Sequence, residues 1–83
     1  MRTLSIPYSD DLLVATGQSP EDLEHDLRIL LAIKLFEVRR LSLGKAAELA
    51  GIPILSFLNE LGHNGVAVIN LDDDQIEDEL RDA

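Results

Sequence analysis

The sequence contains no cysteine and no tryptophan, and aromatic residues make up only 4% of its 83 positions. The absence of cysteine excludes disulfides and thiolate metal sites. A core must therefore be built from aliphatic side chains, which are plentiful, because the hydrophobic fraction is 46%. At this length we expect one small domain that buries only about 60 to 65% of the surface exposed by its unfolded chain.

Long apolar runs and cationic residues are also scarce. The longest unbroken apolar run, residues 29–33, is far too short to span a bilayer, and the first residues lack the apolar region of a signal peptide. We therefore expect a cytoplasmic protein that does not contact membranes. Seven Lys and Arg oppose sixteen Asp and Glu, for a formal net charge of −9, which argues against indiscriminate binding to nucleic-acid phosphates.

Familiar catalytic and ligand-binding patterns are missing as well. Neither His25 nor His63 has a second ligand at a metal-binding spacing, and there is no glycine-rich phosphate loop. The three acids at residues 72–74 lack the glycine and the closing glutamate of a calcium loop. We therefore expect neither an enzyme nor a protein that needs a cofactor or a metal.

Residues 42–62 carry the pattern that is most informative about function, because they predict two short helices joined by a tight turn. Ser42 is a good N-cap, and Gly51 followed by Pro53 suits the end of one helix and the start of the next. Small and bulky apolar residues stand where a helix-turn-helix requires them. These residues are Ala47, Gly51, Ile52 and Phe57. A purely structural helical hairpin has the same spacing, so that alternative stays open.

The second helix of this pair departs from the usual DNA-reading helix, because its predicted polar stripe contains no Lys or Arg. The stripe comprises Ser56, Asn59, Glu60 and His63. The apolar residues Ile54, Leu55, Leu58 and Leu61 cover most of the remaining surface. A helix with so much apolar perimeter is usually buried, so the segment either reads DNA or docks on another protein.

Cations precede this helix pair and acids follow it. Four of the seven Lys and Arg lie between positions 34 and 45, and seven of the sixteen acids lie between positions 72 and 82. The candidate DNA-contacting residues are Lys34, Arg39, Arg40 and Lys45, together with Ser56 and Asn59. Lys and Arg late in a helix also stabilise its negative end, which explains them without DNA.

The rest of the chain predicts a mainly α fold with two short β-strands. Alternating apolar residues predict an N-terminal strand within residues 3–8, and β-branched residues predict a second strand over residues 66–69, after the helix pair. A short helix over residues 10–16, capped by Ser9, follows the first strand.

A long helix is expected to precede the helix pair. The sequence Ser19-Pro20 is a strong helix start, because a capping hydroxyl is followed by proline at the first helical position. Nearly every position of residues 29–36 is apolar, so we expect this half of the helix to be buried on several sides. It is buried either by a second copy, in a homodimer, or by the chain's own later helices.

Residues 71–83 form an acidic tail, which we expect either to bind a partner or only to keep the protein soluble. Ile76 and Leu80 give it a narrow apolar edge that fits a groove. The candidate partner-binding residues are Asp72, Asp73, Asp74, Ile76, Glu77, Asp78, Leu80 and Arg81. The chain is thus divided into a dimerising helix-turn-helix domain, residues 1–70, and this tail.

A family resemblance is carried by the segment LSLGKAAELAGI, which follows RILLAIKLFEVRR and precedes FLNELGHNGVAVI. The chain resembles a family of small prokaryotic helix-turn-helix proteins regarded as candidate antitoxins of PIN-domain toxins. The resemblance runs from about Asp11 onward and is most specific at residues 42–51. It implies a protein that neutralises a PIN-type ribonuclease and represses its own operon by binding operator DNA. The sequence departs from that family at residues 53–56, PILS, where members more often carry polar or charged residues.

Other functions stay open beside the antitoxin. The protein is alternatively a protein–protein interaction module that never touches DNA, or a stand-alone helix-turn-helix transcriptional regulator without a toxin. In a variant of the antitoxin hypothesis, the N-terminal strand enters the major groove as a two-stranded ribbon, with Arg2, Thr3 and Ser5 facing outward.

Overall fold

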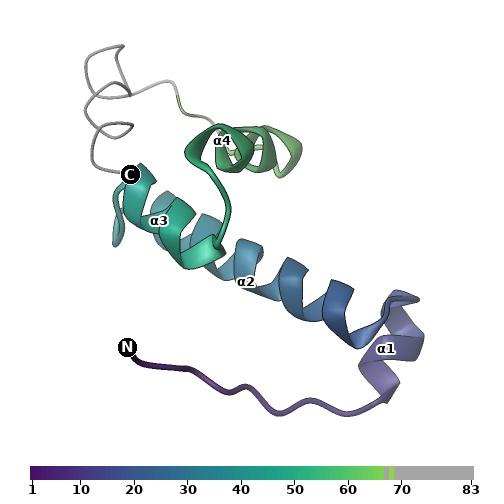
Figure 1. Ribbon diagram of the computed structural model, residues 1–83. Coiled ribbons are helices and arrows are strands. Elements are labelled where there is room, and N and C mark those ends of the chain that lie inside the picture. Colours follow the sequence, from purple (N-terminus) through teal and green to yellow (C-terminus); the bar gives the residue numbers. More distant parts are fainter. Residues whose placement is uncertain (67, 69–83) are drawn as a thin grey trace.

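The computed structural model describes residues 1–66 and 68, and the regular structure in that part of the chain is entirely helical. The helices are α1, Asp11–Thr16; α2, Pro20–Glu37; α3, Leu43–Ala50; and α4, Ile54–His63. α2 runs through the molecule, with α1 at its N-terminal end and with α3 and α4 gathered at its C-terminal end (Figure 1). The candidate site therefore lies at the opposite end of α2 from α1.

α2 begins where the sequence predicts. Ser19 has extended backbone angles, and its hydroxyl accepts a 3.2 Å hydrogen bond from the backbone N–H of Asp22. Pro20 takes the first position of the helix, where no backbone N–H is needed. α1 differs from the prediction, because its N-cap is Asp10 rather than Ser9 and no side chain caps it.

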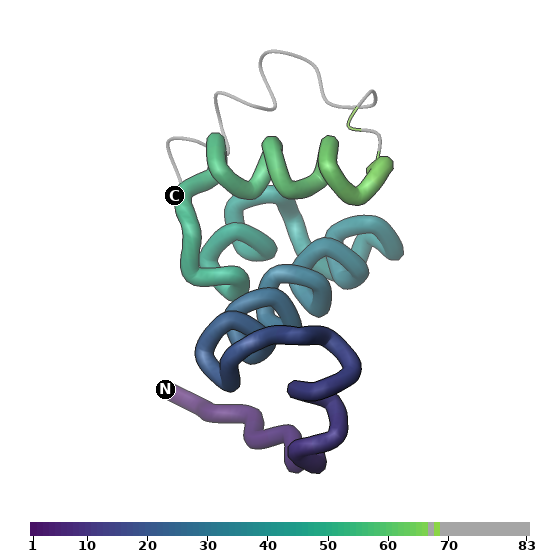
Figure 2. Tube along the Cα trace, turned by 90° about the vertical axis from the view of Figure 1, so that its right-hand side faces the viewer, coloured from purple at the N-terminus to yellow at the C-terminus, as the bar shows by residue number. Residues whose placement is uncertain are grey.

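The core lies where α2, α3 and α4 meet, and Figure 2 shows the three helices gathered above α1 and the N-terminal segment. Its buried side chains are Ile29, Ala32, Ile33, Leu43, Ala46, Ala47, Ala50, Ile54, Phe57 and Leu61. Three alanines on α3 let its backbone approach α2 closely, and the space near the end of α2 is filled by aromatic rings. Phe36 and Phe57 meet edge to face, with ring centroids 6.3 Å apart.

The prediction of two β-strands is wrong for the described residues, because none of them is in a strand. In the N-terminal segment Leu4 is 76% exposed and Ile6 is 49% exposed, so the alternating pattern has no sheet or core to cover there. A strand also needs a partner for its backbone groups, and Pro7 supplies no N–H. Alternation of apolar and polar residues is therefore not enough to predict a strand that pairs in a β-sheet.

The second predicted strand is replaced by packing on the helices. Val66 donates its backbone N–H to the carbonyl of Leu61 at 2.9 Å, as a residue just beyond a helix does. Val66 and Val68 both pack against the helical core. Their β-branched side chains are thus used as core cover, and residues 67 and 69, the other members of the predicted strand, lie outside the described part.

Residues 1–8 form an extended arm that lies beneath α2 in both views (Figures 1 and 2). Its first seven residues are exposed. The arm is tied to α2 by Tyr8, whose hydroxyl donates a 2.6 Å hydrogen bond to the carboxylate of Glu24. This hydrogen bond, which holds the phenol proton, is the main reason that the pKa of Tyr8 is raised above its ordinary value of 10.0.

Candidate helix-turn-helix site

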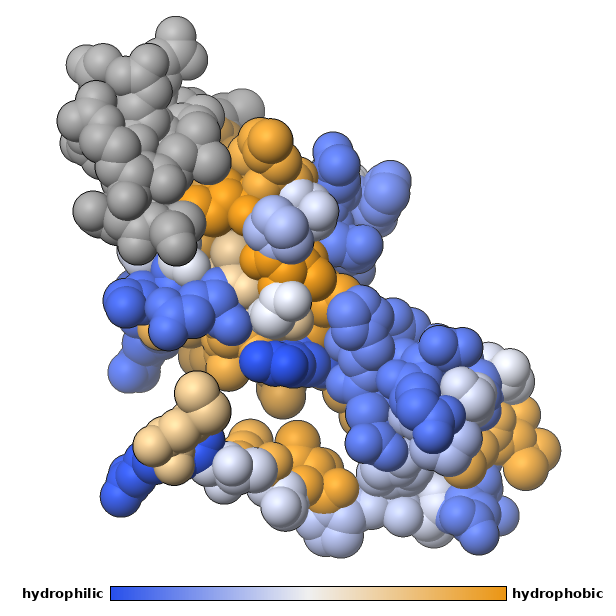
Figure 3. Space-filling view, viewed as in Figure 1, coloured by the Kyte–Doolittle hydropathy of each residue, from blue (hydrophilic) through white to orange (hydrophobic). Residues whose placement is uncertain are grey.

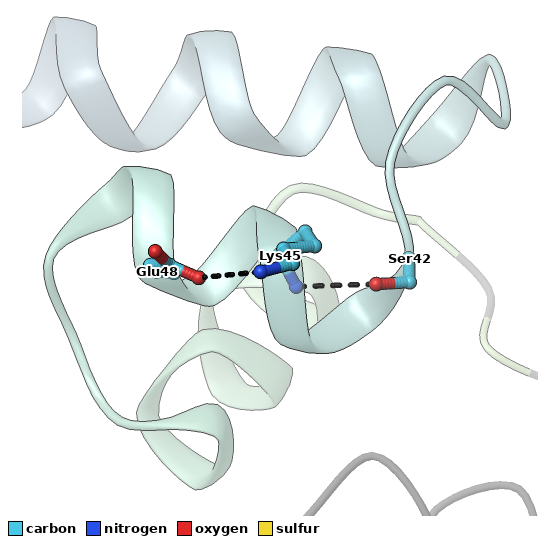
Figure 4. A network of polar contacts seen from close by, with 3 residues as sticks. All are labelled: Ser42, Lys45 and Glu48. Carbon is cyan, nitrogen blue, oxygen red and sulfur yellow. Dashed lines mark hydrogen bonds and ion pairs between the residues drawn. The ribbon is translucent and has the colours of Figure 1, made fainter. Parts of the chain in front are cut away.

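The first helix of the pair is fixed at its start by Ser42. The Ser42 hydroxyl accepts a 3.2 Å hydrogen bond from the backbone N–H of Lys45, which confirms it as the N-cap of α3. The side chain of Lys45 turns the other way and forms a 3.3 Å ion pair with Glu48 (Figure 4). Both partners of this pair are more than two-thirds exposed, so the pair contributes little stability and a phosphate can displace the carboxylate.

The turn between α3 and α4 depends on Gly51. Its φ of 75° is the left-handed conformation that glycine adopts without strain, and its N–H closes α3 by bonding the carbonyl of Ala47 at 2.9 Å. Pro53 then serves as the N-cap of α4 and Ile54 as its first residue, one position later than expected. A connection of only three residues holds the two helices in a fixed relation.

Arg28 of α2 is a positioning residue that the sequence did not single out. Its Nε donates a 2.5 Å hydrogen bond to the carbonyl of Leu49, in the last turn of α3. Its guanidinium also covers Gly51 so closely that a Cβ there would lie 2.9 Å from Nη1. Arg28 and Leu49 are 21 positions apart, and no local pattern signals such a contact.

The outward face of α4 keeps part of its predicted polar stripe. Ser56, Asn59 and His63 are exposed and form no side-chain hydrogen bond within the described residues, so Ser56 and Asn59 remain able to bond base edges. Leu55 lies on the same face and is 66% exposed. Figure 3 shows apolar surface gathered over α3 and α4, with isolated polar residues on it. The face is therefore mixed, suited to hydrogen bonding and to apolar contact.

Glu60 does not belong to this open face. It is half-buried and, with Asp26 and Asn64, lines a shallow hollow between α2 and α4. Asn64 donates its side-chain amide to the backbone carbonyl of Glu60 at 2.8 Å, which stabilises the end of α4. The two acids make this hollow unfavourable for phosphate.

The four predicted DNA-contacting cations are all exposed, but the structure separates them into two kinds. Lys34 forms a 2.9 Å ion pair with Glu37, and Lys45 pairs with Glu48. In contrast, Arg39 and Arg40 form no ion pair with any described residue, and they lie in the connection between α2 and α3. Arg39 has a φ of 63°, which costs a non-glycine residue roughly 1 to 2 kcal/mol.

The predicted partner-binding residues of the acidic tail, residues 71–83, lie outside the described part of the chain, as does the boundary between the two predicted domains. Within the described part, no three His, Asp or Glu side chains are grouped closely enough to hold a metal ion. None of the four described helices combines the length and the apolar character needed to cross a membrane.

Comparisons with known proteins place this helical chain in a family. A family model described as an uncharacterised protein family, UPF0175, matches residues 1–83. A UPF0175 protein of Archaeoglobus fulgidus is 38% identical over 58 residues, which cover 70% of this chain and 66% of the relative, just under two-thirds of its length. No solved structure matches the chain. The chain therefore belongs to the UPF0175 family of uncharacterised proteins.

Proposed function

We propose that this protein is the antitoxin of a type II toxin–antitoxin pair, which neutralises a PIN-type ribonuclease in the cytoplasm and represses its own operon by binding DNA. The observation that carries the DNA-binding part is the helix pair α3–α4. A capped first helix, a three-residue turn with Gly51 in the left-handed conformation and a second helix with a free outer face are the parts that a helix-turn-helix needs.

The side chains on the outer face of α4 would recognise the DNA bases. Asn59 is exposed, and an asparagine amide makes a bidentate pair with adenine in the major groove. The neighbouring Ser56 hydroxyl bonds donors and acceptors alike. Leu55 on the same face would contact a thymine methyl group, which gives an apolar residue a role in base reading.

Phosphate binding would depend chiefly on Arg39 and Arg40, because these cations have no acidic partner within the described residues. Lys34 and Lys45 would add to it by exchanging an exposed carboxylate for a phosphate, at little cost. The formal net charge of −9 repels DNA elsewhere on the surface. We therefore expect weak, steeply salt-dependent binding.

Toxin neutralisation is assigned to the acidic tail, residues 71–83, from its sequence. Its carboxylates, Asp72, Asp73, Asp74, Glu77 and Asp78, would occupy the basic RNA-binding surface of a ribonuclease. Arg81 would form a forked ion pair with the carboxylates that hold the toxin's metal. Ile76 and Leu80 would lie in an apolar groove of the toxin.

Fluorescence anisotropy with DNA from upstream of the gene tests the DNA-binding part. Replacing Arg39 and Arg40 together with Ala should abolish binding, whereas Asn59→Ala should reduce the preference for that DNA over a scrambled duplex. Arg2→Ala in the arm is the matched control. If Arg2→Ala abolished binding while the other variants bound normally, the arm, and not α4, would be the segment that contacts DNA.

Co-expression with a PIN-domain ribonuclease, whose gene the proposal expects beside this one, tests the neutralising part. A chain ending at Asn70 should keep its DNA binding and fail to protect cells, and Arg81→Ala should weaken protection more than any single acid-to-Ala change. Full protection by the shortened chain would refute the tail mechanism. It would direct attention to apolar residues of α4.

A second candidate, a protein–protein interaction module, is favoured by one observation. Leu49 on α3 is 40% exposed and Leu55 on α4 is 66% exposed, so the helix pair presents apolar side chains suited to a protein surface. Leu49→Ser separates the two functions, because Leu49 lies on α3 and has no proposed contact with a base. It would leave DNA binding largely intact but would weaken docking of a protein partner on this face.

A further inference from the structure

α2 is apolar on two opposite sides. Its inner side carries the buried residues Ile29, Ala32 and Ile33. Leu31 is two positions from both Ile29 and Ile33, so it lies about 200° around the helix from each of them. Leu31 is 44% exposed. The helix therefore has a second apolar side that faces away from α3 and α4.

This second side is organised as a row with a regular spacing, here called the outer row: Glu24, Leu27, Leu31 and Lys34. The intervals of three, four and three residues keep all four side chains on one side of the helix. Leu27 is half-buried and Glu24 is exposed, and the Lys34 side chain is 69% exposed. Two leucines thus lie between an acid and a base. Glu24, at the N-terminal end of the row, accepts the hydrogen bond from Tyr8 of the arm, whereas Leu31 and Lys34 are exposed in the described chain.

The outer row is self-complementary, and from this we propose that a second copy of the chain packs antiparallel on α2. Under a two-fold axis midway between Leu27 and Leu31, Leu27 of each copy meets Leu31 of the other. Glu24 then lies opposite Lys34 of the second copy, and the reverse holds by symmetry. A parallel arrangement would place Glu24 against Glu24 and Lys34 against Lys34, which disfavours it.

Charges beyond the row favour the same orientation. The N-terminal turn of α2 carries Glu21 and Asp22, whereas Arg39 and Arg40 follow its C-terminal end. Glu21 and Asp22 lie off the outer row, so their effect is only that of an acidic helix end beside a basic one; antiparallel packing also aligns the two helix dipoles favourably. The present ion pair of Lys34 with Glu37 is exposed, with 69% and 46% of the side chains accessible, so exchange of its partner costs little.

The contact is modest in extent. α2 has 18 residues and is about 27 Å long, and the row covers little more than half of that length. Standard stable interfaces bury roughly 800 Å² on each partner, more than one helix face of this size supplies. Association in the micromolar range is therefore expected. The interface shares Lys34 with the proposed phosphate contacts but involves neither the outer face of α4 nor the acidic tail, so sedimentation without DNA or toxin tests it separately from the proposed function.

Sedimentation equilibrium of the full chain across the micromolar range measures dimerisation, and reversing the charges of Glu24 and Lys34 tests the proposal. Glu24→Lys and Lys34→Glu should each weaken dimerisation about tenfold or more, because each change puts two like-charged pairs into the interface. The double variant E24K/K34E restores opposite charges and should return the dissociation constant to that of the wild type. Tyr8→Phe controls for the lost hydrogen bond between Tyr8 and Glu24 and should leave the dimer unchanged.

A leucine pair supplies a second, independent measurement. Leu31→Glu should make the chain monomeric at 9.2 kDa, whereas Leu55→Glu, at a leucine on α4 that is also exposed, should not. Circular dichroism should show unchanged helicity for both variants, because neither leucine is buried in the monomer. A monomeric wild type, single charge reversals without effect, or a double variant that fails to recover would each overturn the proposal.

Discussion

Replacing Gly51 with Ala should destabilise the fold by two separable effects. The first is backbone strain, because φ at Gly51 is 75° and a side chain in the left-handed region costs roughly 1 to 2 kcal/mol. The second is the displacement of Arg28, whose Nη1 would lie 2.9 Å from the new methyl group. Displacement weakens the hydrogen bond from Arg28 to the carbonyl of Leu49, worth about 1 kcal/mol for an exposed charged donor. The expected total is about 2 to 3 kcal/mol.

The two effects can be measured apart with a matched position and a double-mutant cycle. Gly65 has a φ of 71°, and a methyl group added there would meet no atom within 4 Å, so Gly65→Ala should show the strain alone, roughly 1 to 2 kcal/mol. In an Arg28→Ala background, Gly51→Ala should cost no more than Gly65→Ala. Urea denaturation followed by circular dichroism gives these free energies of unfolding. In thermal scans each kcal/mol corresponds to a fall in Tm of about 4 to 8 °C.

The result that would refute the reasoning is equal destabilisation by Gly51→Ala with and without Arg28. It would mean that Arg28 does not lie over the turn, and that the relation between α3 and α4 is set by the core alone. The contact between Arg28 and the turn at Gly51 should also affect DNA binding. If α4 reads DNA, Arg28→Ala should weaken operator binding although Arg28 itself contacts no base.

Four further predictions follow from the described contacts. Phe57→Ala should lower the free energy of unfolding by about 3 to 5 kcal/mol, because Phe57 is fully buried against Phe36, whereas Leu55→Ala should change it by less than about 0.5 kcal/mol in the same urea titration. Ser42→Ala should cost about 1 kcal/mol by thermal unfolding through loss of the α3 cap, and no change would argue against that bond. Lys45→Gln should alter stability by less than about 0.5 kcal/mol, since its ion pair with Glu48 is exposed; a larger loss in urea would contradict this. Phenolate absorbance should place the pKa of Tyr8 above 10.0, and Glu24→Gln should lower it toward that value, unless the hydrogen bond to Glu24 does not form in solution.

Local chemistry made the starts of α2 and α3 and the end of α3 predictable from sequence, whereas α1 lacks the predicted Ser9 cap and α4 begins one residue later than predicted. Ser19 and Ser42 cap the backbone three residues ahead, and Gly51 ends α3 through its own conformational freedom. These signals act within a few residues, so they have the same effect in almost any fold. The candidate site was predictable to the same degree, since the exposed residues Ser56 and Asn59 follow from the period of a single helix.

The predicted strands failed because β structure is not a local property. Leu4 and Ile6 have the alternation of a strand, and Val66 has the branched side chain, yet a strand needs a neighbouring strand, which the described residues do not supply. Val66 instead covers the helical core, where its side chain is equally well accommodated. A hydrophobic pattern indicates that a side chain will be buried, but it does not indicate which part of the protein buries it.

The sequence by itself determined where α2 and α3 start and where α3 stops, that the core is mostly aliphatic, and that cations gather around the start of the helix pair while acids follow it. Only the tertiary structure decided that Glu60 turns into a hollow, that Arg28 holds the turn at Gly51, and that Leu31 lies on an open side of α2. The physical reason is the range of the interactions. Caps and turns are set by neighbours along the chain, whereas burial and the contact of Arg28 with residues more than twenty positions away depend on how whole helices pack.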